Sequence, residues 1–67
     1  MQAVIANETV RLTQALPELN LDRGQVGVVR SSWMYPNEAY EVEFNVRQET
    51  QHQRLRLLLL NHQIEWD

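Results

Sequence analysis

Two short segments constrain the fold of this chain more than any other feature. Residues 24–29 combine glycine with a run of valines, and residues 39–44 alternate between apolar and acidic or small side chains. A period of two places alternate side chains on opposite faces of a strand. We therefore predict two strands of one small twisted sheet, joined by a turn at Pro36 and Asn37. This fixes the fold class as all-β, and it does not by itself indicate an activity.

The length of the chain predicts a single domain with a small core. A chain of 67 residues buries only about 60% of its unfolded surface, and small domains are usually stabilised by disulfides, metals or oligomerisation. The sequence has no cysteine, and His52 and His62 lack the spacing of a zinc site. We expect no disulfide, metal or other cofactor. Self-association is the remaining aid, unless barrel closure or packing of Trp33 and Trp66 suffices.

The charge of the chain bears on its partners and its location. The net charge is -3 and the pI is about 5.2, whereas general nucleic-acid binding depends on a surplus of Lys and Arg. Nucleic acid is therefore not the expected partner. The first eight residues lack the pattern of a signal peptide. Because no apolar run approaches the ~18 residues of a membrane helix, we expect a soluble cytoplasmic protein that does not contact a membrane.

We divide the chain into a lead-in at residues 1–8 and one domain at 9–67. Strands are predicted at residues 9–14, 25–33, 39–46, 53–60 and 64–66. Leu16, Leu19 and Leu21 can attach the long loop after the first strand to the core, and Pro17 limits any helix there to one turn. Gly27 predicts a bulge or a sharp bend. Residues 61–63 predict a single helical turn before the last strand.

Residues 52–62 are rich in leucine and could instead form a helix. The alternation of residues 54–57 favours a strand. A hairpin centred between residues 48 and 49 would place Glu41 opposite Arg56 and Glu43 opposite Arg54. Apolar pairs would occupy the other face: Tyr40 with Leu57, and Val42 with Leu55. Because the tip lacks the glycine of a tight turn, a register shifted by two residues is the alternative.

This order of elements matches an SH3-like barrel, and the chain resembles the small bacterial domain of unknown function 4926 over residues 9–66. The similarity is carried by residues 10–12, 16–17, 21, 24–29 and 39–44. The resemblance implies a five-stranded SH3-like barrel and no catalytic residues. It also implies a genomic context among toxin, antitoxin or immunity genes.

Several residues could in principle support catalysis. Glu41 and Glu43 lie on one strand face, but with arginines opposite them they are better explained as solvated ion pairs. Both histidines fall in predicted turns without a nearby nucleophile, and residues 31–32 lack the glycines of a nucleophile elbow. We therefore predict no catalytic residue and no enzyme activity.

Two apolar features are candidates for partner binding. Trp33, Met34 and Tyr35 are residue types enriched at binding hot spots, although Trp33 could instead cap the core under a cover from Tyr35. If Leu57 and Leu59 face the core, Leu58 and Leu60 need other cover. The loop at residues 16–21 or the segment at 4–5 could supply it. Otherwise the two leucines form an exposed patch of the kind found at interfaces.

We predict a non-enzymatic protein–protein interaction module with a regulatory or antitoxin/immunity-like role. Its partner would be a protein of unknown identity, and a homo-oligomer is a further expectation. The predicted partner-binding residues are Trp33, Met34, Tyr35, Leu58 and Leu60. One alternative is a nucleic-acid-associated barrel, suggested by the glycine-bearing segment at residues 23–29. The other is a small accessory subunit of a larger enzyme.

Overall fold

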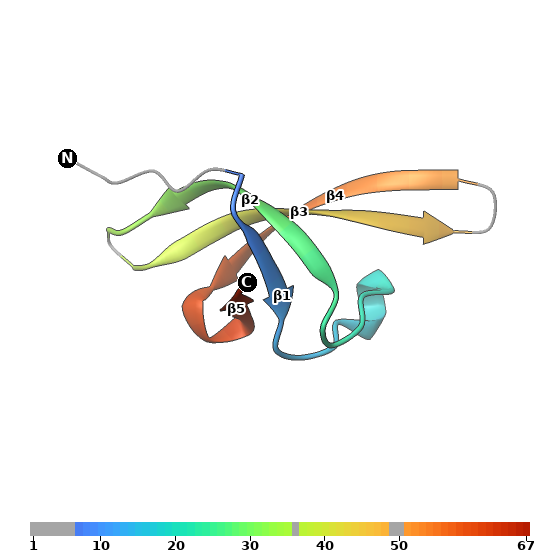
Figure 1. Ribbon diagram of the computed structural model, residues 1–67, viewed down its shortest axis with the longest axis horizontal. Helices are drawn as coiled ribbons and strands as arrows, with labels where there is room; N and C mark the ends of the chain where they lie inside the picture. Colours follow the sequence, from blue (N-terminus) through green and yellow to red (C-terminus); the bar gives the residue numbers. More distant parts are fainter. Residues whose placement is uncertain (1–6, 36, 49–50) are drawn as a thin grey trace.

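The computed structural model describes residues 7–35, 37–48 and 51–67. Five antiparallel strands form one sheet in the order β4-β3-β2-β1-β5 (Figure 1). The strands are β1 (Thr9–Leu12), β2 (Val26–Trp33), β3 (Ala39–Gln48), β4 (Gln51–Leu60) and β5 (Ile64–Trp66). Two single turns of 3-10 helix, η1 (Pro17–Leu19) and η2 (Asn61–Gln63), complete the described elements. The all-β class is confirmed, and barrel closure stays a prediction.

All five predicted strands are present, and all but the last have one shifted end. The first strand ends at Leu12 rather than at residue 14. β3 continues to Gln48, two residues beyond its predicted end, and β4 begins at Gln51, two residues before its predicted start. The helical alternative for residues 52–62 is wrong, because all of β4 pairs with β3. His52 accordingly lies in β4 and not in a turn. Among the described residues, no helix has the length and apolar character to cross a membrane.

The core lies on one face of the sheet, which we call the inner face. Its fully buried side chains include Phe44, Val42, Val29 and Val10. The other members of the core cluster are Leu12, Leu21, Tyr40, Val46, Leu59 and Ile64. Leu21 comes from the long loop, and Leu16 and Leu19 pack against the same cluster. The predicted attachment of this loop to the core is confirmed, as is its single helical turn.

The two glycines have different structural roles. Gly24 has φ +86°, a backbone conformation that side chains disfavour. Gly27 packs directly against core side chains, and an added Cβ would be 2.6 Å from both the Phe44 ring and Val42. The predicted bulge at Gly27 is wrong. The irregularity lies between Val29 and Ser31, so Arg30 is the extra residue of β2.

The β3–β4 hairpin is the longest feature of the molecule, and one end of it projects beyond the other strands (Figure 1). The described chain measures 42 × 21 × 19 Å along its principal axes. The predicted hairpin register is wrong by two residues. Glu43 lies opposite Arg56 and Glu41 lies opposite Leu58. The apolar pairs shift accordingly: Tyr40 pairs with Leu59, and Val42 with Leu57.

Candidate functional site

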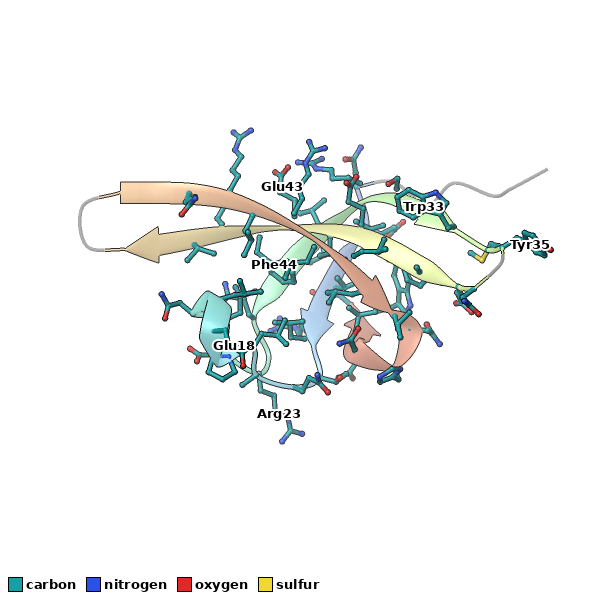
Figure 2. All side chains as sticks on the ribbon, turned by 180° about the vertical axis from the view of Figure 1, so that it is seen from behind. Glu18, Arg23, Trp33, Tyr35, Glu43 and Phe44 are labelled. Carbon is teal, nitrogen blue, oxygen red and sulfur yellow. The ribbon has the colours of Figure 1, made fainter. Side chains whose placement is uncertain are left out.

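The face of β2, β3 and β4 that points away from the core divides into an apolar end and a charged end. We call it the outer face. Figure 2 shows Trp33 and Glu43 on this side of the sheet and Phe44 on the other. The ladders align three rows of outer-face residues: Trp33–Ala39–Leu60, Ser31–Glu41–Leu58 and Val28–Glu43–Arg56. The bulge at Arg30 permits this alignment, because the extra residue shifts the alternation of side chains along β2. Ser31 and Trp33 therefore face the same side of the sheet as Val28.

The apolar end of the outer face is hollowed into a groove of about 330 Å³, which we call the outer groove. It is lined by Trp33, Tyr35, Asn37, Ala39, Leu58 and Leu60. Leu58 is 65% exposed and Trp33 is 41% exposed. Large apolar side chains that remain this accessible next to one another are typical of a contact surface.

Four of the five predicted partner-binding residues line the outer groove. Met34 is the exception, although it is exposed. Trp33 lies outside the core cluster, and Tyr35 is 87% exposed (Figure 2). The alternative in which Trp33 caps the core and Tyr35 covers it is therefore wrong. Sequence reasoning missed Ala39, which the ladders place between Trp33 and Leu60.

The described part of the chain leaves Leu58 and Leu60 without cover. The loop leucines that could have covered them pack against the core on the inner face. The other proposed cover, Val4 and Ile5, lies outside the described residues. β4 itself offers no β-branched or aromatic neighbour from residue 54 onward, since its outer-face residues there are Arg54, Arg56, Leu58 and Leu60.

The charged end of the outer face is an ion-pair cluster around Glu43. The Nε of Arg56 donates to one carboxylate oxygen of Glu43 at 3.0 Å, and Arg30 donates to the other at 3.3 Å. These interactions lower the pKa of Glu43, the hydrogen bond from Arg56 being the largest cause. Arg56 also lies 3.9 Å from Glu41, which accepts a hydrogen bond from Ser31.

This cluster corrects one predicted ion pair. Glu43 pairs with Arg56 and Arg30 rather than with Arg54, and Arg54 lies opposite Asn45. The Glu41 contact with Arg56 is present, although the two residues are not directly opposite. A carboxylate held by two guanidinium groups has a lowered pKa, whereas a general acid needs a raised one. The arrangement suits a structural ion pair.

A buried tyrosine adjoins the groove from the inner side. The Tyr40 hydroxyl donates to the carboxylate of Glu38, and its ring meets the Trp66 ring edge-on, with centroids 5.1 Å apart. The hydrogen bond to Glu38, together with burial, raises the pKa of Tyr40 to about 12. This contact fixes the start of β3 directly beside Ala39 and the outer groove.

The remaining candidates do not assemble into a reactive site. His62 is exposed in η2, and its backbone carbonyl accepts a hydrogen bond from Thr13. Ser31 donates to Glu41, which is a carboxylate and not a histidine base. Within the ranges that the structure describes, no three acidic or histidine side chains cluster as metal ligands would.

Comparison with known proteins identifies a family for this chain. No curated protein and no solved structure matches the chain significantly. A family model matches residues 7–53 of the 67, which is more than half of the sequence. The matched span includes β1, β2 and β3 and the start of β4. The chain therefore belongs to the family described as domain of unknown function (DUF4926).

Proposed function

We propose that the protein is a non-enzymatic interaction module that binds a partner protein through the outer groove. The observation that carries this proposal is the convergence of Trp33 from β2 with Leu58 and Leu60 from β4 around one exposed apolar hollow, with Ala39 of β3 between them. Full burial of a leucine-sized side chain contributes about 1.5–3 kcal/mol, and the exposed parts of Trp33, Leu58 and Leu60 leave a share of this free energy unrealised. A partner that inserts an apolar side chain would recover that free energy.

The composition of the groove favours a protein over other ligands. Tryptophan and tyrosine dominate the binding energy of many protein interfaces, and Trp33 and Tyr35 line one side of this groove. A nucleic-acid role would instead need free cations on the surface. Two of the six arginines, Arg30 and Arg56, are engaged by Glu43, and the net charge is -3.

The concrete version of this role is regulatory or antitoxin-like action in the cytoplasm, in which binding to the groove controls the partner. Its support is the resemblance of the chain to proteins expected among toxin, antitoxin and immunity genes. A small accessory subunit of a larger enzyme would also bind its partner through the outer groove. Identification of the partner therefore separates these two roles.

The test begins with capture of partners from the native host and ends with purified components. The affinity of the identified partner would be measured for the wild type and for Trp33→Ala and Leu58→Thr. We expect each variant to weaken binding by about tenfold or more, as for a hot-spot residue. Threonine is chosen because a glutamate at position 58 would lie opposite Glu41. Arg23→Glu, in a loop on the far side of the sheet (Figure 2), is the control.

Two outcomes would contradict the proposal. Unchanged affinity in both groove variants would show that the partner binds elsewhere. A shift of RNA or DNA at low salt, lost as salt is raised, would favour the nucleic-acid alternative.

A further inference from the structure

We infer that the free edge of β4 accepts an added β-strand, in which an apolar residue lies beside Leu58 and an acidic residue lies beside Arg54. The inference rests on the proposed function, because the added strand would extend the outer face next to the outer groove. It specifies the kind of partner: an extended segment rather than a helix or a small molecule. This mode of recognition uses backbone hydrogen bonds for affinity and alternate side chains for specificity.

The backbone of β4 is positioned for such pairing. β4 is an end strand of the sheet, with β3 as its only neighbour in the described sheet order. The N–H of Leu60 donates to Oε1 of Gln63 at 2.8 Å, so it points away from β3. In an antiparallel ladder, the residues that bond the neighbouring strand alternate with residues that do not. By that alternation the N–H and C=O groups of Arg54, Arg56 and Leu58 also point away from β3.

The edge lacks most of the usual protective features. Natural sheets block an exposed edge with a short strand, charged side chains, a proline, a bulge or a covering segment, and of these β4 has only the charged residues Arg54 and Arg56 among its described side chains. β4 is ten residues long and contains no proline. Its ladder with β3 runs from Ala39↔Leu60 to Gln48↔Gln51 without a shift in register. Within the described residues, only Gln63 caps this edge, and it does so at the Leu60 end.

The side chains beside the edge define the chemistry of the added strand. Outer-face residues along β4 change from Arg54 and Arg56 to Leu58 and Leu60. Arg56 is held by Glu43, whereas Arg54 is exposed and forms no ion pair with any described residue. The added strand would place a carboxylate beside Arg54 and an apolar side chain beside Leu58. In the added strand, the apolar residue and the acidic residue are four positions apart. The apolar residue comes first if this strand runs antiparallel to β4.

A second copy of the chain fits this edge less well. β4 carries no acidic residue, so pairing of two β4 strands would leave Arg54 without a carboxylate. It would also leave the charge pattern of the edge unmatched. The occupant that the observations favour is therefore a segment of another protein.

The direct test is a peptide titration of the full chain. The probe is a nine-residue threonine peptide with blocked ends, isoleucine at its third position and glutamate at its seventh. A second peptide with the two residues exchanged tests the parallel orientation. We expect backbone amide hydrogen exchange to slow about tenfold or more at Arg54, Arg56 and Leu58. Exchange at Leu55 and Leu57 should not change, because these residues already pair with β3.

Two matched sets of variants separate strand addition from simple groove binding. N-methylation of the fifth peptide residue removes an N–H that faces β4 and should weaken binding about tenfold or more, whereas the sixth faces away and serves as the control. Arg54→Glu should weaken binding of the glutamate peptide by about fivefold, which corresponds to an exposed ion pair. A peptide with lysine at the seventh position should restore binding to that variant. The control variant Arg23→Glu should bind the glutamate peptide and the lysine peptide with the same affinities as the wild type.

Three results would overturn the inference. Peptide binding without protection of Arg54, Arg56 and Leu58 would exclude strand addition and leave the outer groove as a binding site. No binding of either peptide at millimolar concentration would exclude an acceptor edge for this pattern, while the Trp33→Ala test of the proposed function would stand independently. Protection that appears without peptide as the protein concentration rises would assign the edge to a second copy.

Discussion

Arg56 lies directly opposite Glu43 on the outer face, and its Nε donates a 3.0 Å hydrogen bond to Oε1 of that glutamate. Arg30 approaches the other carboxylate oxygen from β2. The hairpin register and the bulge thus place two guanidinium groups on one carboxylate. The Glu43 side chain is only 9% exposed, so solvent screens this cluster less than an open surface pair.

Acid should destabilise the protein through Glu43. Its folded-state pKa lies below the ordinary value of 4.5, so its contribution is present above that value and is lost as pH falls through the lowered pKa. We expect the free energy of unfolding to fall in acid more steeply in the wild type than in Glu43→Gln. Urea denaturation across the acid range measures this, with Glu18→Gln in η1 as control. Equal acid dependence in all three proteins would contradict the prediction.

The same substitution should cost much more stability at Leu59 than at Leu58. Leu59 is 3% exposed in the core, and Leu58 is 65% exposed on the outer face. Leu59→Ala should reduce the free energy of unfolding by about 2–5 kcal/mol through lost burial and a cavity. Leu58→Ala should cost less than about 1 kcal/mol. Thermal or urea unfolding measures both, and similar costs would mean that Leu58 is covered.

Gly27→Ala should be destabilising because of the Phe44 ring. The added methyl group would lie 2.6 Å from Phe44 and Val42, both fully buried, and overpacking of this kind costs about 1–3 kcal/mol. A double-mutant cycle with Phe44→Leu should show a coupling of more than about 0.5 kcal/mol. Gly24→Ala is the control, since a side chain there meets no atom within 4 Å and suffers only from φ +86°. Additive effects in the Gly27 cycle would exclude the proposed clash.

Tyr40 should ionise at unusually high pH. In Tyr35→Phe, Tyr40 is the only tyrosine, and its ultraviolet titration should give a pKa of about 12. Because the folded-state pKa is raised, the stabilisation is complete below pH 10.0 and is lost as pH rises from there through about 12. Replacing Glu38 with Gln should lower the pKa of Tyr40 and reduce this alkaline loss of stability. Titration near 10.0 with Glu38 intact would contradict the assignment.

Much of the fold could be predicted because alternation is a local signal. The faces of β3 and β4 follow from the period of two, and so does the separation of Leu59 from Leu58. The hairpin register could not be obtained in this way. A shift of two residues preserves both faces, and it leaves Glu43 opposite an arginine whether the partner is Arg54 or Arg56.

The candidate site was only partly predictable for a related reason. Composition singled out Trp33, Tyr35 and the exposed leucines, but it could not show that they share one groove. The shared groove depends on the register of the hairpin and on the bulge at Arg30. No residue type near position 30 predicts that bulge. The contribution of Ala39 follows from the ladders alone.

The pairing of β1 with β5 has a consequence for folding kinetics. β2, β3 and β4 are consecutive along the chain, so each pairs with a strand that is close in sequence. In contrast, the pairing of β1 with β5 brings together residues that are far apart: Arg11 and Asp67, which share a hydrogen bond there, are 56 residues apart. Closing so long a loop costs entropy before any contact repays it. We expect the β2–β3–β4 meander to be structured in the transition state and the β1–β5 ladder to form afterwards. Substitutions at Ile64 would then mainly accelerate unfolding, and substitutions at Val42 would mainly slow folding.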